Sequence, residues 1–144
     1  MKHIVRLLLT GALLWCRLAP STAQEVEASD MVRGGMQAIQ MIDRGQAGEL
    51  WDGATAATRK RVSRADFISV VASSRLSLGE PQIRTWVAVN RQVLANADAD
   101  TAGHYVTIEY ETRFSSKPGA TRREVVRFHL DPDRLWRFSG YVLR

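Results

Sequence analysis

Three polar residues at otherwise apolar positions of the chain have side chains that could do chemistry. Arg84, Tyr110 and Glu124 each lie on, or next to, an alternating apolar pattern that is typical of a strand. A polar side chain that faces a core needs a partner there. A pair between Glu124 and an arginine inside the sheet would be structural, whereas contact with a ligand would be functional. A desolvated Glu124 with Tyr110 as proton donor could also form an acid–base pocket of the isomerase or hydratase type.

Arg75 poses the same choice where a predicted helix becomes a strand, in the stretch 73–86, SSRLSLGEPQIRTW. A cation near a helix C-terminus stabilises the last carbonyl groups. Gly79 then allows the chain to reverse, and Pro81 prevents the helix from continuing. Arg75 is therefore interpreted as part of a structural joint, paired with Glu80 or a strand acid. The alternative is an anion-binding arginine at the mouth of the domain, because a guanidinium presents five donors to carboxylate or phosphate.

Aromatic residues are spread over both halves of the chain and could fill the core or line a pocket between sheet and helices. They include Trp51 and Phe128, for which core packing is the simpler interpretation. The tentative ligand-binding set combines aromatic residues with the polar candidates: Arg75, Trp86, Tyr110, Glu124, Trp136 and Tyr141.

Other catalytic chemistries have no pattern in the sequence. His104 and His129 lack a short metal-ligand spacing and are expected on opposite strand faces, and Asp131 and Asp133 favour a turn. The sequence also lacks the G-x-S-x-G, phosphate-loop and dinucleotide-binding glycine motifs. We therefore expect no metal and no cofactor, and we assign no catalytic residue.

Residues 1–23 have the pattern of a secretory signal peptide. A basic start precedes the apolar run LLLTGALLW at 7–15, and small residues surround a cleavage site after Ala23. The run is shorter than the roughly 20 residues that span a bilayer. We therefore expect a periplasmic or secreted protein whose mature domain is 24–144.

Two alternatives to cleavage after Ala23 stay open. One is an uncleaved N-terminal anchor. The other is a lipid anchor on Cys16, although the bulky Trp15 precedes that cysteine. Cleavage would lower the formal charge from +5 to +2, because Lys2, Arg6 and Arg17 leave with the signal. It would also remove the single cysteine of the chain, so the mature domain would contain no disulfide.

The first half of the mature chain is predicted to be helical. In 25–45, Val32, Met36, Ile39 and Ile42 recur at the spacing of one helical face, and Gly45 is a stop signal. A short second helix is predicted within 46–59. A third is predicted to begin at Ser63 with Asp66 as its capping partner and to bury Phe67, Val70 and Val71.

The second half has the period-two pattern of four strands. Their predicted faces group Arg84 with Trp86 and Ala88, Val106 with Ile108, Tyr110, Thr112 and Phe114, Glu124 with Val126, Phe128 and Leu130, and Trp136 with Phe138, Gly140 and Val142. Helices followed by four consecutive strands predict an α+β fold with helices packed on a curved antiparallel sheet.

The chain resembles the bacterial domain-of-unknown-function 4019 family. The resemblance lies in LWDGATAATRKRVSRADF, SRLSLGEPQIR, VTIEYETRF, REVVRFHL and LWRFSGYVL, and most clearly in R-x-x-L-G at 75–79 and W-R-x-x-G-Y at 136–141. It implies an exported bacterial domain and a cone-shaped α+β roll similar to nuclear-transport-factor-2-like or cystatin-like folds. It implies no known activity, and such folds host enzymes, binders and scaffolds alike.

The function that we expect is therefore a non-enzymatic ligand- or protein-binding module of the bacterial envelope, with the isomerase- or hydratase-type pocket enzyme as the alternative. The expected partner is an envelope protein or a small apolar or anionic ligand. Nucleic acid is excluded as a partner by export. Weak contact with a membrane surface, through basic residues such as those at 59–61, and a homodimer both stay open.

Overall fold

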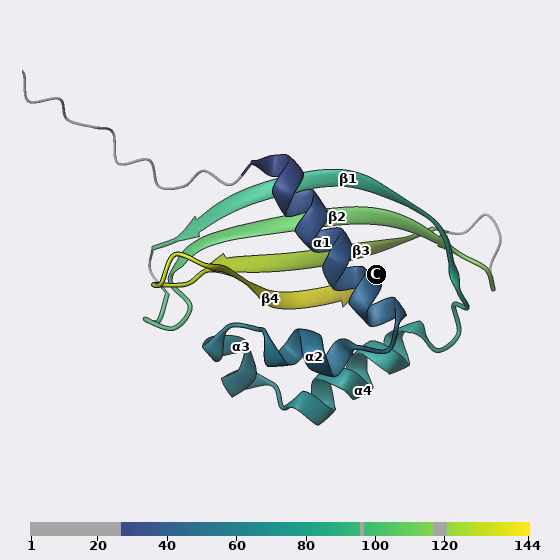
Figure 1. Ribbon diagram of the computed structural model, residues 1–144, viewed down its shortest axis with the longest axis horizontal. Helices are drawn as coiled ribbons and strands as arrows, with labels where there is room; N and C mark the ends of the chain where they lie inside the picture. The colour runs from purple at the N-terminus through teal and green to yellow at the C-terminus, as the bar shows by residue number, and fades with distance from the viewer. Residues whose placement is uncertain (1–26, 96, 117–120) are drawn as a thin grey trace, which may run out of the picture.

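The computed structural model describes residues 27–95, 97–116 and 121–144 (Figure 1). The predicted signal peptide with Cys16 lies outside the described residues. Four helices precede four strands, which confirms the α+β fold class: α1 (Ala28–Asp43), α2 (Ala47–Asp52), α3 (Ala56–Arg61), α4 (Arg64–Arg75), β1 (Pro81–Leu94), β2 (Gly103–Phe114), β3 (Thr121–Leu130) and β4 (Trp136–Leu143).

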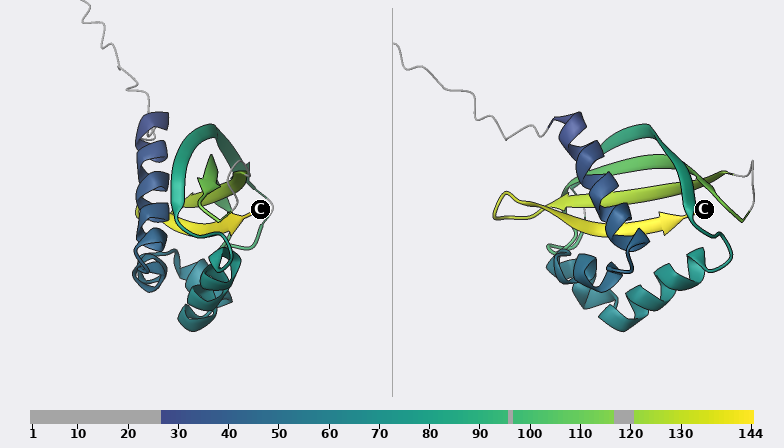
Figure 2. Two further views of the ribbon diagram at one scale, coloured as in Figure 1. Left: turned by 90° about the vertical axis from the view of Figure 1, so that its right-hand side faces the viewer. Right: turned by 45° about the vertical axis from the view of Figure 1, so that its right-hand side comes forward.

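The strands form one antiparallel sheet in the order β1-β2-β3-β4. Helix α1 crosses one face of this curved sheet, and α2, α3 and α4 lie together beyond the β4 edge (Figures 1 and 2). The face toward α1, called here the inner face, carries the predicted apolar sets of β2 and β3. Ile108 and Val126 pair directly across the two strands and have no solvent exposure.

Capping residues set the helix boundaries. Ser63 Oγ accepts a hydrogen bond from the Asp66 amide at 3.1 Å, as predicted, and Gly45 adopts a left-handed φ of 75° after α1. The single helix predicted within 46–59 is instead two helices. Gly53 caps α2, and Thr55 begins α3 by accepting from the Thr58 amide. No helix of the described ranges combines the length and apolar character that crossing a membrane requires.

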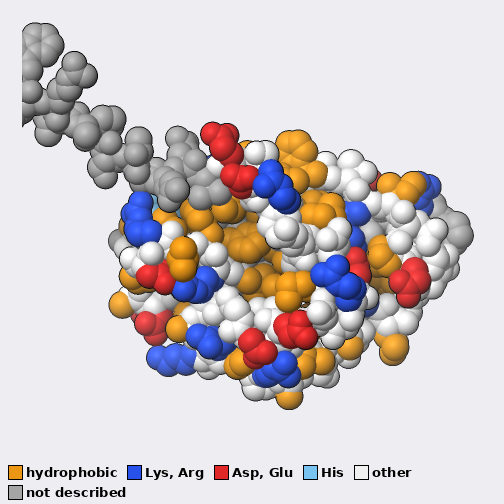
Figure 3. Space-filling model, in the orientation of Figure 1, with side chains coloured by type: hydrophobic (Ala, Val, Ile, Leu, Met, Phe, Trp, Pro, Cys, Tyr) orange, Lys and Arg blue, Asp and Glu red, His pale blue; other side chains and the backbone are white. Residues whose placement is uncertain are grey.

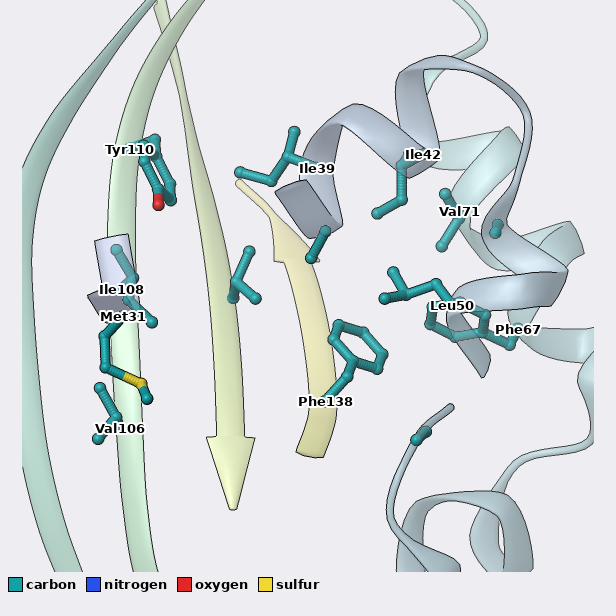
Figure 4. Packing of buried hydrophobic residues seen from close by; sticks show 14 residues of the cluster. Met31, Ile39, Ile42, Leu50, Phe67, Val71, Val106, Ile108, Tyr110 and Phe138 are labelled. Carbon is teal, nitrogen blue, oxygen red and sulfur yellow. The ribbon is translucent and has the colours of Figure 1, made fainter. Parts of the chain in front are cut away.

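The core joins the helices to the inner face (Figure 4). Ile39 of α1 is fully buried, and Phe67 of α4 meets Phe138 of β4 edge-on with ring centroids 5.7 Å apart. Val71 is buried as predicted, whereas Val70 is 65% exposed. Phe67 and Val71 are four residues apart and share one narrow face of α4, and Val70 lies outside that face.

Two register shifts correct the predicted faces of the edge strands. In β1 the shift lies between Trp86 and Ala88, so that Val89, not Ala88, continues the inner face. In β4 the shift follows Phe138, so that Tyr141 faces inward while Val142 is 54% exposed. One extra residue in a strand reverses the alternation beyond it, and the period-two pattern alone does not reveal that insertion.

Gly35 marks the closest approach of α1 to the sheet. The Tyr110 hydroxyl donates a hydrogen bond to the Val32 carbonyl of α1, and the ring lies beneath Gly35. A Cβ at position 35 would lie 2.6 Å from the Tyr110 oxygen. At the neighbouring Gly34 the nearest atom, in Phe128, would be 3.7 Å away, which is an ordinary contact.

We expect Gly35→Ala and Gly34→Ala to change stability in opposite directions. Gly35→Ala must displace α1 or the buried Tyr110, and we expect a loss of about 1–3 kcal/mol in the free energy of unfolding. Gly34→Ala, the matched control, should gain up to about 1 kcal/mol, because alanine is the better helix former. Chemical denaturation measures both. Equal effects would contradict the close packing at Gly35.

Candidate functional site

Six polar side chains meet where α1 and α4 end against the inner face of the sheet. We call them the charge cluster: Asp43 of α1, Arg75 of α4, Arg84 of β1, Thr112 of β2, Glu124 of β3 and Tyr141 of β4. The cluster thus links two helices to all four strands. Its two acidic and two basic residues balance in formal charge.

Glu124 is the centre of the charge cluster and has no solvent exposure. Its Oε1 accepts from Arg75 Nη2 at 2.5 Å and from the Tyr141 hydroxyl at 2.7 Å. Its Oε2 accepts from Arg84 Nε at 2.6 Å and from Thr112 Oγ1 at 2.5 Å. Each carboxylate oxygen therefore has two donors, which is the number it can accommodate. This saturation leaves no free position for a substrate proton.

Asp43 bridges the two arginines from the other side. Its Oδ1 accepts from Arg75 Nη1 at 2.6 Å, and its Oδ2 accepts from Arg84 Nη1 at 3.0 Å. The arginine side chains are only 14% and 9% exposed. Buried charges of this kind are tolerated when each is both paired and hydrogen-bonded, as here. Arg75 is therefore held by a strand acid and a helix acid, which confirms the structural pair predicted for it.

The surroundings fix the protonation states within the charge cluster. Burial alone would raise the pKa of Glu124, but the bond from Thr112 and the charge of Arg84 outweigh burial, and the pKa is lowered. Burial and the adjacent Glu124 charge raise the pKa of the Tyr141 phenol, which therefore stays a donor. Burial likewise raises the pKa of Tyr110 to about 12.

The structure brings together three of the six predicted ligand-binding residues, Arg75, Glu124 and Tyr141. Tyr110 is the direct cross-strand neighbour of Glu124, but its hydroxyl is directed to α1. Trp86 is 51% exposed on β1, and Trp136 lies near the opposite end of the sheet, next to Leu130. The ligand-binding role of these residues stays a prediction.

Three members of the charge cluster are absent from the predicted set. Arg84 and Thr112 had a signal, because each is a polar residue at an inward position of a strand pattern. Asp43 had no such signal: it is the last residue of α1, and only the tertiary structure places it between Arg75 of α4 and Arg84 of β1.

A pocket of about 240 Å³ opens beside Arg75 and Asp43. Its other walls are apolar residues of α1 and α4, such as Ile42 and Val71, together with the joint at Gly79, Glu80 and Pro81. The joint is held to the end of β2, where the Ser116 amide donates to the Leu78 carbonyl. Arg75 therefore belongs both to the charge cluster and to the wall of this pocket.

The contacts of His129 lie within the protein. His129 is buried, with Nδ1 2.8 Å from Asp131 Oδ1 and Nε2 2.9 Å from the Ala102 carbonyl oxygen. His129 pairs across the strands with Tyr105, so His104 faces the opposite side, as predicted. Within the described ranges, no three His, Cys, Asp or Glu residues are grouped as a metal site would need.

The fold and the charge cluster define an α+β domain whose helices are fastened to the sheet by buried ion pairs. The family model described as "Protein of unknown function (DUF4019)" matches residues 34–141. The chain belongs to this family, and the match includes every member of the charge cluster. A search of curated proteins found no match to the chain.

We expect Arg75→Ala to lower the free energy of unfolding by about 3 kcal/mol, because it leaves Glu124 buried with fewer donors. Arg64→Ala is the matched control in the same helix. Its ion pair with Asp52 joins side chains that are 47% and 52% exposed, so we expect little change. Chemical denaturation compares the two variants. Equal, small losses would contradict a stabilising charge cluster.

We also expect acid to remove the stability that ionised Glu124 contributes. The pKa of Glu124 is lower in the folded protein than in the unfolded chain. Its contribution to the free energy of unfolding is therefore fully present above the ordinary glutamate pKa of about 4.3, and it is lost as the pH falls through the pKa of the folded state. The stability difference between the natural protein and Glu124→Gln should therefore shrink below about pH 4. Denaturation between pH 7 and pH 3 measures it, with Glu111→Gln, on an exposed position of β2, as the control for loss of a carboxylate. A stability difference between the natural protein and Glu124→Gln that is constant across this pH range would contradict an ionised, stabilising Glu124.

Proposed function

We propose that the protein is an exported domain of the bacterial envelope that acts as a non-enzymatic binding module. The observation that carries this proposal is the contrast between two kinds of site. The polar groups of the charge cluster are bonded to one another, whereas arginine-containing pockets open on the surface of the domain. Pockets of a few hundred cubic ångströms with a few polar groups are typical of small-ligand sites.

The same contrast disfavours the isomerase or hydratase alternative. That chemistry needs a carboxylate that takes up a proton from a substrate. Glu124 already accepts four hydrogen bonds, and its lowered pKa makes it a weak base. Tyr110 and Tyr141 donate to Val32 and Glu124, so neither phenol is directed toward a pocket.

Export is supported by the basic start and short apolar run of residues 1–23.

The mixed surface charge is consistent with a module that meets a specific partner. On the face that carries α1, acidic and basic side chains alternate rather than gather by sign (Figure 3). Such a surface offers no broad field for non-specific attraction to a polyanion.

A protein partner is the second form of binding, and the sheet edge favours it. The β4 edge is covered by α3, because the Thr55 amide donates to the Phe138 carbonyl. Strand β1 pairs with β2 alone within the described ranges, and it exposes Ile83, Trp86 and Val87. An open strand edge with exposed apolar side chains suits a partner that adds a strand, a second copy of the chain included.

Mass spectrometry of the protein purified gently from its own cells tests both parts of the proposal. We expect it in the envelope or the medium, with a chain that begins at Gln24. In native spectra we expect an added mass, either a small molecule or a protein partner. A lipid on Cys16 would also appear as a defined mass increase.

Recovery from the cytoplasm with residues 1–23 intact would contradict export. A native mass without any retained molecule or partner, from several mild preparations, would contradict the binding role. Denatured spectra of the same samples are the control, because they separate covalent from retained mass.

A further inference from the structure

The pocket beside Arg75 lies where two helices end. Helix α1 ends at Asp43 and α4 ends at Arg75, and both of these residues line the pocket. The C-terminal end of a helix carries the partial negative charge of the helix dipole, which attracts cations. The last turn of α1 contains no basic side chain that would compensate this charge. The position of the pocket therefore favours a positively charged group in it.

Arg75 adds no free positive charge to the pocket, although it lines the wall. Its guanidinium donates to Asp43 Oδ1 at 2.6 Å and to Glu124 Oε1 at 2.5 Å. Two acids and two arginines balance within the charge cluster, so the charge of Arg75 is compensated inside the domain. This compensation disfavours the anion-binding role considered for Arg75 from the sequence.

Glu80 is the one charged residue of the pocket wall, among the described residues, that lies outside the charge cluster. Its side chain is exposed, and its carboxylate has no hydrogen bond or ion pair with another described residue. Its backbone is held, because the Glu80 amide donates to Ser115 Oγ at 3.0 Å and the Glu80 carbonyl accepts from the Ser115 amide at 2.9 Å. A held backbone with a free side chain keeps the carboxylate beside the pocket and lets it turn toward a cation.

The rest of the pocket wall is mainly apolar. Ile42 of α1 and Ile68 and Val71 of α4 form part of it, and Pro81 adds the first residue of β1. The volume of about 240 Å³ lies below the range of about 300–1,000 Å³ that is typical for drug-sized ligands. The space therefore suits a short aliphatic chain better than a large ligand.

We infer that the pocket beside Arg75 binds a small primary amine in its cationic form. The ammonium group lies between Glu80 and the C-terminal ends of α1 and α4, and the aliphatic chain lies against Ile42, Ile68 and Val71. This inference rests on the proposed binding role, and it names a site and a ligand class for that role.

Titration of the methyl-labelled protein with hexylamine, followed by NMR, tests the inference. The methyl resonances of Ile42, Ile68 and Val71 should shift in a saturable way. Hexanol has the same chain without the charge, and hexanoate has the opposite charge. We expect hexylammonium to bind about two- to fivefold more tightly than hexanol, which is the range of an exposed ion pair. Hexanoate should bind most weakly of the three.

Glu80→Gln is the decisive variant, because the Glu80 carboxylate has no partner among the described residues that the substitution would break. We expect it to lower the affinity for hexylammonium to that for hexanol. The affinity for hexanol and the melting temperature should not change. Glu27→Gln, the matched control, removes the same charge from an exposed position at the other end of α1 and should change neither affinity.

A second pair of variants tests the position of the aliphatic chain. Ala72→Leu fills the pocket from an exposed position of α4, and it should weaken the binding of both hexylammonium and hexanol about tenfold. Ala65→Leu, the matched control, lies on an exposed position of the same helix outside the pocket wall and should leave both affinities unchanged. Leucine is nearly as good a helix former as alanine, so both variants should fold.

Four results would overturn the inference. They are the absence of saturable binding by hexylammonium, equally tight binding of hexanoate, an affinity for hexylammonium that Glu80→Gln or Ala72→Leu leaves unchanged, and resonance shifts confined to residues outside the pocket. A molecule retained from cells together with any of these results would leave the binding role intact and place its site elsewhere. Amine binding with no molecule or partner retained from cells would confirm the site and contradict the binding role.

Discussion

The carboxylate of Glu124 is fully buried on the inner face of the sheet and accepts four hydrogen bonds. An ionised group in that position is stable only if cations and donors reach it from other elements. Arg84 does so from β1, and Arg75 does so from the end of α4. The position of α4 is therefore tied to the sheet by charge as well as by apolar contact. Asp43 extends the same constraint to α1, because it accepts from both arginines.

The charge cluster also anchors the segment that joins the helical half of the chain to the sheet. Arg75 ends α4 and is held by its ion pairs, and the chain then reverses at Gly79, whose φ is 72°. The Glu80 carbonyl accepts from the Ser115 amide, so the joint is also bonded to the end of β2. The joint that forms one wall of the pocket beside Arg75 is therefore bonded at both of its ends. The side chains of the charge cluster use their donors and acceptors to hold the fold together, so they are not free to react.

The bulge in β4 decides which side chains of this strand face the charge cluster. By inserting one residue after Phe138, it turns Tyr141 inward to the Glu124 carboxylate. The carbonyl of Ser139, next to the bulge, accepts a hydrogen bond from the Thr58 hydroxyl of α3 at 3.1 Å. Bulges often redirect a side chain at a functional position, and here one bulge both completes the charge cluster and bonds β4 to the helical half of the chain.

The residues alone were sufficient for helices followed by four strands, although not for the division of α2 from α3, because apolar periodicity and capping residues are local signals. Helices α1 and α4, the inner faces of β2 and β3, and a Glu124–arginine pair all followed from them. The family resemblance also followed, since each of its motifs is a short run of neighbouring residues that can be read directly from the sequence. Tertiary structure decided what depends on register and on distant segments. A bulge reverses a strand face without any change in the apolar pattern, so the inward turn of Tyr141 was hidden. Asp43 has no local signal either, because it acquires its two arginine partners only when elements far apart in the chain pack together.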